Sequence, residues 1–558
     1  MKPRLLAVTS ILGVASTASA GGLLLPGAGP VSTSRAGASV VDSEDGEALT
    51  LNPANIAKTE GTVIDIGFAA IDYFMSFKRN GTYDNVPGQA YSGMPYPTIS
   101  NNPSPSVAIP GTGFVPVPVI AISSDLGNRI PGLKMAVGLY APNAYPFRDM
   151  NTVNGQSYFT TNAMGAQDFP AGFGNPPPPT RYDVIHQEAM ILLPSIVAAY
   201  RVLPQLDVGV RFSEGFANLK SSVALWGVPA NYSEDIRQDG LVTINASENF
   251  IPEFSVGATY RATPTLEFGA RYTSELDINA KGTALSINGP DVTLGSSGAP
   301  VLLLPATGYN STTGLPNFQC ANGGTMTVFK ACLDLALPQT ATVGGRWKLL
   351  DDRGNMKGDV ELDIDWENWG TSMASNYLVT VDAIAATAAD QTDGINLKQN
   401  YVNHGFQDTY AARLGGSWIV PAGDNQLVLR GGVSYDTAAA KTGWERADID
   451  GAAREMIAAG ASYKVGRQWK IDAGLGVILE GTRTDPRTCD PTPAAPGCAG
   501  TPGYPAGSSA TQEPPNQRQG PDPINPIIES NVQAESPVNE GTYKSHYFLF
   551  MLGGSYRF

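Results

Sequence analysis

The three histidines of this sequence are its best candidates for acid–base chemistry, but their spacing does not support a catalytic site. His186 and Ser195 lie nine residues apart in one strand-like stretch. An odd spacing places two side chains on opposite faces of a strand, so this stretch cannot pair a nucleophile with its base. His404 lies near Asp408 in sequence typical of a polar loop. We therefore expect no enzyme activity.

Four cysteines form two local pairs, Cys320 with Cys332 and Cys489 with Cys498, in sequence rich in Pro and Gly. No C-x-x-C spacing occurs and the histidines are scattered, so we expect no metal site and no cofactor. In an exported protein, pairs of this kind predict disulfides that close small loops.

Basic side chains recur where charged and apolar residues alternate, and such cations could meet the carboxylate of a ligand. The candidates for this role are Arg211, Arg271 and Arg430, with Arg413 and Lys470 in similar surroundings. The alternative is that the cations pair with neighbouring acids and hold an interior together. The acids concerned are Asp207, Glu267, Asp363, Asp365 and Asp472. For any single cation, pairing is the stronger expectation.

The first twenty residues have the pattern of a secretory signal peptide. Lys2 and Arg4 precede an apolar stretch over 5–14, and Ala18-Ser19-Ala20 supplies a cleavage site. The formal net charge of −15 argues against a nucleic-acid partner. After residue 20 no apolar run reaches the roughly eighteen residues of a membrane helix, which leaves a soluble exported protein or a closed β-barrel.

Alternation of apolar and polar residues predicts fourteen strands in the 558-residue chain, an even number, as in bacterial single-chain barrels. The predicted strands cover 62–75, 114–124, 132–141, 182–201, 205–226, 252–262, 264–286, 338–348, 358–372, 408–420, 425–437, 454–465, 468–483 and 542–558. Short and long connections alternate between them, as in barrels with short periplasmic turns and long extracellular loops. In the stretch 361–366, acids alternate with apolar residues, which predicts an apolar face toward lipid and a charged face toward the lumen.

A short phrase of small residues followed by Tyr or Trp recurs at the ends of predicted strands that precede short turns. Its copies are 197–202, 257–262, 344–349, 415–420, 460–465 and 553–558. These aromatic rings predict one interface girdle of a membrane barrel. A second girdle is predicted from Tyr73, Tyr140, Trp226, Tyr272, Trp369 and Tyr435. The last copy, with Gly553, Tyr556 and Phe558 in register, resembles the C-terminal signal that the outer-membrane assembly machinery recognises.

Residues 21–61 show no strand period and could fold inside the barrel as a plug. The fold class expected is therefore all-β, a 14-stranded antiparallel transmembrane β-barrel with an N-terminal plug (hatch) inside the lumen. The expected domains are a signal peptide over 1–20, a hatch over 21–61 and the barrel over 62–558.

The segment 32–57 resembles the N-terminal plug of the FadL-like family, outer-membrane transporters of long-chain fatty acids and other hydrophobic compounds. The matching elements are Arg35-Ala36-Gly37, the acidic run from Asp42 to Asp45, and Asn52-Pro53-Ala54. Segments 114–142, 181–202, 337–349 and 406–418 are also similar, so the resemblance spans the mature chain. The Arg-Ala-Gly element is shorter than in the family, and the connections at 287–337 and 484–541 are long.

The resemblance implies an outer-membrane protein of a Gram-negative-type cell that takes up hydrophobic ligands passively. Ligands would enter the lumen and leave sideways into the membrane, through a gap in the wall beside a kinked strand. Hatch rearrangement would gate this step, with Asn52, Pro53, Ala54, Arg35 and Gly37 as the gating candidates. The expected partners are the ligand, membrane lipid and the assembly machinery.

Two other functions remain open from the sequence. A general diffusion porin would pass small polar solutes, but the plug-like segment 21–61 argues against an open channel. A surface interaction protein would use its long Pro-rich loops, among them 76–113 and 484–541.

Overall fold

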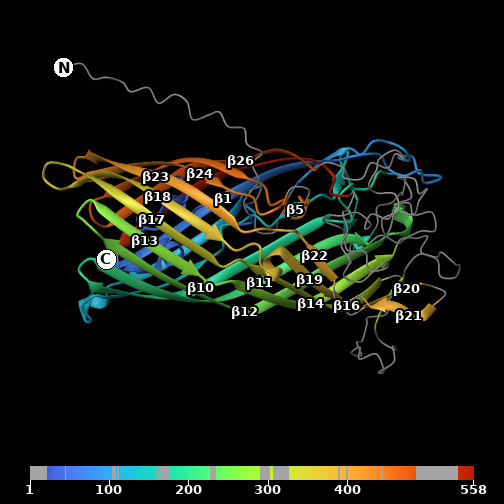
Figure 1. Cartoon of the computed structure of the whole chain (residues 1–558), viewed down its shortest axis with the longest axis horizontal. Helices are drawn as coiled ribbons and strands as arrows, with labels where there is room; N and C mark the ends of the chain where they lie inside the picture. Colours follow the sequence, from blue (N-terminus) through green and yellow to red (C-terminus); the bar gives the residue numbers. More distant parts are fainter. Residues whose placement is uncertain are drawn as a thin grey trace, which may run out of the picture.

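A closed β-barrel with strands strongly tilted to its long axis forms the body of the protein (Figure 1). The computed structural model describes residues 22–43, 46–102, 108–109, 112–158, 160–161, 167–168, 175–225, 234–288, 302–305, 326–381, 383–387, 390–396, 400–441, 444–485 and 538–558. Several sequence predictions concern positions outside these residues: the signal peptide, Glu44, Asp45, Trp226, Cys320, Cys489 and Cys498.

The barrel has fourteen antiparallel crossings, which confirms the predicted fold class. In chain order they are β1 (Thr62–Arg79), β3 (Val115–Ser124), β4 (Leu133–Tyr140), β10 (His186–Leu203), β11 (Leu206–Leu225), β12 (Gly240–Arg261), β13 with β14 (Leu266–Thr273, Leu276–Asn288), β16 with β17 (Met326–Leu337, Thr340–Leu350), β18 (Met356–Glu367), β23 (Thr409–Ala422), β24 (Asn425–Asp436), β25 (Arg454–Val465), β26 (Trp469–Asp485) and β27 (Gly541–Arg557).

Shorter elements decorate the barrel. Those paired with wall strands are β2 (Thr98–Ser100), β5 (Arg148–Asp149) and β19 (Asn376–Val381), and β22 (Asn400–Asn403) pairs with β19. Separate small sheets contain β6 (Thr152–Val153) with β7 (Gln156–Ser157), β8 (Thr160–Thr161) with β9 (Gln167–Asp168), and β15 (Leu302–Pro305) with β20 (Ala383–Thr387) and β21 (Asp390–Asn396). The helices outside the hatch are η2 (Leu126–Asn128), η3 (Ile236–Gln238) and α3 (Ser372–Ser375).

The last strand closes the barrel against the first. β27 pairs with β1 along its whole length, from Val63↔Arg557 to Arg79↔Gly541. Short turns join strands at the end that holds the C-terminus, and the longer connections lie at the end that holds β20 and β21 (Figure 1). The predicted alternation of short and long connections is therefore confirmed.

The wall extends further at the long-connection end than the sequence predicted. β12 begins at Gly240 rather than at 252, and β16 is a strand that lies inside the predicted connection 287–337. In both regions apolar residues face inward and polar residues outward, as Ile244 and Asn245 do in β12. The apolar-outward pattern used for prediction therefore does not recognise them.

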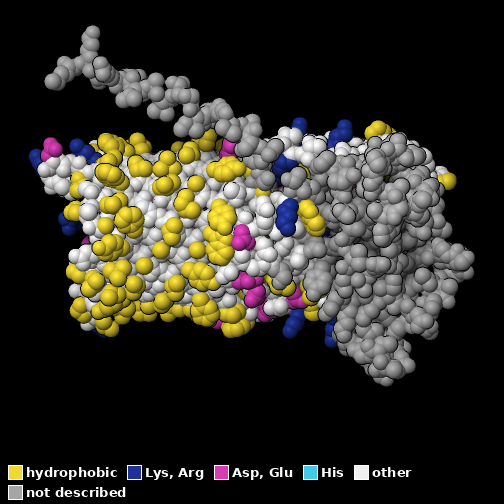
Figure 2. Space-filling view, in the orientation of Figure 1, with side chains coloured by type: hydrophobic (Ala, Val, Ile, Leu, Met, Phe, Trp, Pro, Cys, Tyr) yellow, Lys and Arg dark blue, Asp and Glu magenta, His cyan; other side chains and the backbone are white. Residues whose placement is uncertain are grey.

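An apolar band encircles the half of the barrel nearest the short turns, and charged side chains gather along its border (Figure 2). Ring side chains of the recurring phrase face outward in this band, with Trp347 62% and Tyr260 48% exposed. The second predicted girdle is only partly correct. Tyr272 and Tyr435 face outward, but Tyr73, Tyr140 and Trp369 are buried inside the barrel. Within the described part of the chain, no helix is long and apolar enough to cross a membrane.

The described residues of the hatch fill the lumen at the level of the apolar band. They form α1 (Pro30–Ser34), α2 (Ala48–Leu51) and η1 (Pro53–Lys58), and most of their side chains are buried. Wall residues of different strands lie against them: Gly67 and Gly553 lie against Pro30, while Gly209 lies against Pro53.

Candidate functional site

Glycines on the inner face of the wall form the seat of the hatch. An added Cβ would overlap Arg35 at Gly432, Ser34 at Gly460, and Asn52 at Gly257. Several of these glycines belong to the recurring phrase, whose glycine and aromatic ring lie three residues apart and so face opposite sides of a strand. The phrase therefore contributes to both faces of the wall, because its aromatic ring lies on the outer surface while its glycine leaves room for the hatch on the inner surface.

Two acids of β18 hold the hatch backbone through its N–H groups. Asp363 accepts hydrogen bonds from Ser39 N at 2.8 Å and Val40 N at 2.9 Å. Glu361 accepts from Val41 N at 2.7 Å and from Asp42 N at 3.1 Å. The predicted charged inner face of residues 361–366 is thus present, and it binds the hatch.

The Arg35 guanidinium joins the hatch to the same wall strand. It lies 3.0 Å from Asp359 and 3.1 Å from Glu361, and all three side chains are fully buried. Its Nε also donates to Ala38 O at 2.8 Å, which fixes the turn that follows α1. Asp42 lies 3.3 Å from Arg35 and also pairs with Arg346 of β17. Removing one member would leave uncompensated buried charge, so the network specifies how the hatch sits.

Gly37 occupies a backbone conformation that only glycine adopts easily. Gly37 lies just after the end of α1 and has a φ of +88°. Its N–H donates a hydrogen bond to Ser32 O at 2.9 Å. An added Cβ would also lie 2.9 Å from the Arg413 side chain of the wall. The predicted hatch residue therefore has a steric role at the contact between hatch and wall.

Asn52-Pro53-Ala54 begins η1 and attaches it to the wall. Asn52 Oδ1 accepts from Ala54 N at 3.1 Å, and Nδ2 donates to Val40 O at 2.8 Å. Pro53 stands at the first position of the helix, where no N–H is needed. Gly209 of β11 leaves room for the Pro53–Ala54 backbone. The motif is an anchor of the hatch in this structure.

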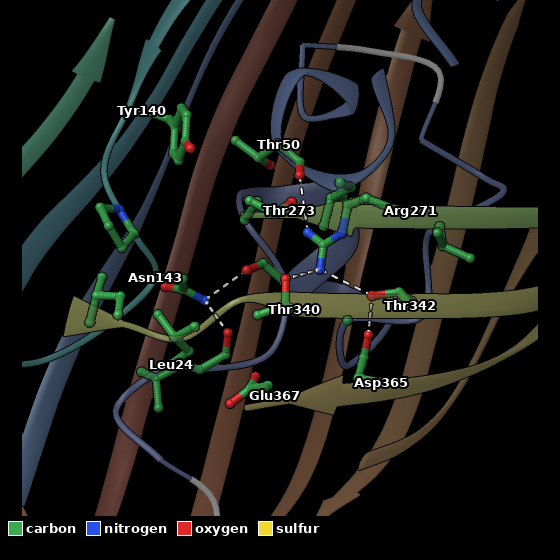
Figure 3. Close-up of a pocket in the computed structure, with 18 of the residues that line it drawn as sticks. Leu24, Thr50, Tyr140, Asn143, Arg271, Thr273, Thr340, Thr342, Asp365 and Glu367 are labelled. Atoms are coloured by element: carbon green, nitrogen blue, oxygen red, sulfur yellow. Dashed lines mark hydrogen bonds between the residues drawn. The ribbon is translucent and has the colours of Figure 1, made fainter. Parts of the chain in front are cut away.

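A polar cavity of about 150 Å³ lies between the hatch and the wall (Figure 3). Arg271 of β13 faces it and donates to Thr50 O at 3.1 Å and to Thr342 Oγ1 at 3.0 Å. Among the described residues no carboxylate lies within salt-bridge distance of Arg271, and its Nε is buried without a hydrogen-bond partner. Thr342 Oγ1 in turn donates a hydrogen bond to Asp365. Arg211 Nε and Arg413 Nη1 are likewise buried without a hydrogen-bond partner, so Arg271 differs from these two cavity cations in having no carboxylate partner among the described residues.

The other predicted cations have carboxylate neighbours. Arg211 also lines the cavity but pairs with Glu253, and its guanidinium lies 4.9 Å from the Tyr140 ring centre. Arg413 pairs with Asp365 and with Asp436, while Arg430 bonds Ser462 and lies 3.9 Å from Asp472. Lys470 lies 3.4 Å from Asp472. Arg430 and Lys470 do not line the cavity.

An apolar chamber of about 210 Å³ adjoins the polar cavity, and every side chain that lines it is apolar. The two spaces share Ala141, Pro142 and Leu337 as lining residues. The remaining lining residues of the chamber are Leu23, Val115, Pro116, Val117, Pro118, Ala144, Pro146, Phe147, Ala189, Met190, Ile191 and Leu192.

The chamber lies at a gap in the wall between β3 and β10. β4 pairs with both strands but ends at Tyr140, so 115–118 of β3 and 188–192 of β10 have no described strand between them. Ala141 N donates to Pro118 O at 3.2 Å, so the backbone of Pro118 faces the gap rather than β1. Pro116, two residues earlier, faces the same way. Neither proline has an N–H, so this edge presents no donor there.

Beyond the apolar band, charged side chains tie the long connections together. His404 Nε2 lies 2.8 Å from Asp448 Oδ2, not against Asp408, and Arg446 bonds both Asp448 and Asp183. Burial raises the pKa of Asp183 to about 6, although Arg446 opposes this effect. These contacts join the segment before β10 with the segments around β23 and β25.

The residues of the predicted assembly signal lie at the closure of the barrel. Gly553 faces Pro30 of the hatch, and the Tyr556 ring packs against Trp469 and Phe558 at centroid distances of 4.5 and 4.8 Å. Cys332 lies in β16, so its predicted pairing with Cys320 is not tested by the described residues.

Comparison with known proteins assigns the family. Residues 11–488 match the family model described as "Outer membrane protein transport protein (OMPP1/FadL/TodX)". The chain belongs to this family. As a FadL/TodX-family member it is an outer-membrane channel for hydrophobic compounds and not an enzyme, as the sequence predicted. No match was found among curated protein sequences.

Solved structures show the same fold at low sequence identity. A Pseudomonas aeruginosa FadL homologue is similar with a TM-score of 0.64 and 12% identity, covering 96% of this chain and 100% of its own. The Ralstonia pickettii toluene transporter TbuX gives a TM-score of 0.55 and 14% identity, covering 96% and 99%. The P. putida toluene transporter TodX gives 0.53 and 13%, with the same coverage. These FadL/TodX structures support the barrel with a plug.

Proposed function

We propose that this FadL/TodX-family channel takes up long-chain fatty acids, or related hydrophobic compounds with an acidic head group, by passive transport. The observation that carries the proposal is Arg271, which faces the polar cavity without a carboxylate partner among the described residues. A fatty acid carboxylate accepts hydrogen bonds and would complete this environment. An uncharged aromatic compound would leave the guanidinium as it is.

The acyl chain would occupy the apolar chamber. The chamber touches the polar cavity at Ala141, Pro142 and Leu337, so a head group at Arg271 can extend its chain toward the wall gap. Each buried CH₂ contributes about 0.8 kcal/mol, which favours an apolar route over repeated exposure to water. Release would then proceed sideways, between β3 and β10.

The hatch would gate this route. It fills the lumen beside the cavity, and Leu24, Leu25 and Thr50 line the cavity wall. Asn52, Pro53, Ala54, Arg35 and Gly37 would set its resting position through the contacts described above. A general porin is disfavoured because the hatch occupies the path that a polar solute would take.

The processing predictions stay part of this proposal. Residues 1–20 would be removed as a signal peptide, 21–61 would form the hatch, and 62–558 the barrel. Gly553, Tyr556 and Phe558 would direct assembly, and the four cysteines would form two loop disulfides.

Binding of a labelled long-chain fatty acid to detergent-purified protein tests the proposal. Arg271→Met should weaken binding roughly 10- to 100-fold, because a charge-assisted hydrogen bond contributes about 1.5–3 kcal/mol. The alkane of the same length should bind the parent and the variant equally. Arg430→Met is the matched control, since Arg430 faces the lumen but does not line the cavity. If the intact protein shows no saturable fatty acid binding, the proposal is wrong. If Arg271→Met weakens binding of the fatty acid and of the alkane equally, Arg271 does not bind the carboxylate.

A further inference from the structure

The polar cavity and the apolar chamber are separated by the first described residues of the hatch. Leu24, Leu25 and Gly27 line the cavity, whereas Leu23 lines the chamber. The backbone between them therefore forms part of a partition across the proposed ligand route. Residues 23–27 precede the first helix of the hatch, because α1 begins at Pro30.

The partition is held by the segment that follows β4. Leu24 and Ala144 form an antiparallel bridge, and Leu25 N donates to Asn143 O at 2.6 Å. The hatch thus pairs with residues 143–144 through an isolated β-bridge. The same segment edges the wall gap through Pro142, Ala144 and Phe147.

The Asn143 side chain is the centre of this contact. Its Nδ2 donates toward three consecutive backbone carbonyls, those of Leu25 at 3.4 Å, Pro26 at 3.0 Å and Gly27 at 3.1 Å (Figure 3 labels Asn143 and Leu24). Its Oδ1 is buried without a hydrogen-bond partner. Three acceptors require the amide nitrogen, so an aspartate at this position would repel them.

We propose that Asn143 is a positioning residue for transport, which holds residues 24–27 closed between the head-group cavity and the chamber at the wall gap. This inference rests on the proposed function, because it assigns a step within the same route. Release of these carbonyls would merge the two spaces. A second contact comes from Arg454 of β25, whose guanidinium donates a hydrogen bond to Leu24 O at 2.7 Å.

A reversible crosslink tests the partition directly. Leu24→Cys with Ala144→Cys joins the two bridge partners, whose spacing in an antiparallel pair suits a disulfide. With the crosslink oxidised, the acyl chain of a labelled fatty acid should be kept from the chamber, so its transfer to lipid vesicles should slow at least roughly tenfold, and a reductant should restore it. The parent, treated with the same oxidant and reductant, controls for its own cysteines. Equal transfer rates in both redox states would overturn the inference.

A second measurement needs no ligand and separates this inference from the proposed function. In Asn143→Ala, amide exchange of residues 22–28 should accelerate while that of η1 stays unchanged, and ligand transfer should become faster without weaker binding. A variant that merely misfolds would lose binding and protect neither segment. Unchanged exchange at 22–28 would contradict the role of Asn143, whereas absence of fatty acid binding in the parent would contradict only the proposed function.

Discussion

The wall of this barrel follows opposite rules in two regions. At the level of the apolar band, Val210 and Phe254 face outward with 55% and 57% of their surface exposed, and the inward positions carry Asp207 and Arg211. Beyond the band, Ile278 and Ala280 are fully buried inside, while Asp277 and Asn279 face outward. The first region is built for an apolar exterior, and the second resembles a soluble barrel with an apolar interior.

The interior of the barrel differs between the two regions for a second reason, which is that the hatch lies at the level of the apolar band. A chain segment with little regular structure exposes N–H groups, and these need acceptors when they are buried. The wall supplies them from Glu361 and Asp363 at the level of the band. A charged lumen here is therefore a docking surface for the hatch, and Arg271 stands out because no carboxylate among the described residues pairs with it.

The largest effect is expected where the hatch is held. Glu361→Leu removes a buried acid that bonds Arg35 and two hatch amides, so the hatch should lose about 3–5 kcal/mol of local stability. Amide exchange of residues 39–42 and ion conductance in a planar bilayer should both increase. Asp277→Ala, an exposed acid beyond the band, is the control and should change neither. Unchanged exchange in Glu361→Leu would mean that the hatch is held elsewhere.

A lysine placed on the outer surface distinguishes the two regions directly. Val210→Lys puts a charge in the apolar band and should destabilise the folded barrel in a bilayer by about 2–4 kcal/mol. Asn279→Lys puts the same charge on the exposed face beyond the band and should stay within about 0.5 kcal/mol of the parent. Urea unfolding in lipid vesicles measures both. Equal costs would contradict the assignment of the band to the membrane.

The glycine seat should show a smaller effect. Gly257→Ala brings a methyl group into Asn52, so the hatch should be destabilised by about 1–3 kcal/mol through local overpacking. Gly431→Ala adds the same group on the outer face, where the nearest atom lies 3.8 Å away. Exchange of residues 52–58 should rise in the first variant only, and a rise in both would point to general loosening of the wall.

The smallest effect concerns pH and the long connections. Burial, together with the nearby Glu234 carboxylate, raises the pKa of Asp84 to about 7. Because the folded state binds this proton more tightly than the unfolded chain, the stabilisation falls as pH rises from about 4 and is lost above about 7. Exchange of the segment around Asp84 should therefore be faster at pH 8 than at pH 5. Asp84→Asn should remove this dependence, and a parent with no pH dependence would show that Asp84 titrates normally.

The wall could be predicted from sequence because its period-two pattern, turn lengths and aromatic ends all point to one topology. Prediction failed where that pattern inverts, at the start of β12 and in β16, and where a ring faces inward, as Tyr73 does. The dual role of the recurring phrase was readable in principle, because Gly257 and Tyr260 are three residues apart.

The site was harder to predict because its properties depend on pairing between distant strands. Alternation placed Arg211, Arg271 and Arg430 on the inner face without showing which acids would meet them. Arg211 forms an ion pair with Glu253, whereas the hydrogen bonds of Arg271 go to threonine hydroxyls and a backbone carbonyl. The wall gap depends on where β4 ends, and Pro116 and Pro118 were the sequence signal of an edge without donors.

The most direct test of the account uses a fatty acid that carries a photoreactive diazirine at its terminal carbon. The account predicts that, after binding and irradiation, mass spectrometry finds the crosslink on 115–118 or 188–192, and that Arg271→Met abolishes it. Crosslinks that fall on the long connections, or that persist at the wall gap without Arg271, would contradict a head group in the polar cavity with its chain in the apolar chamber.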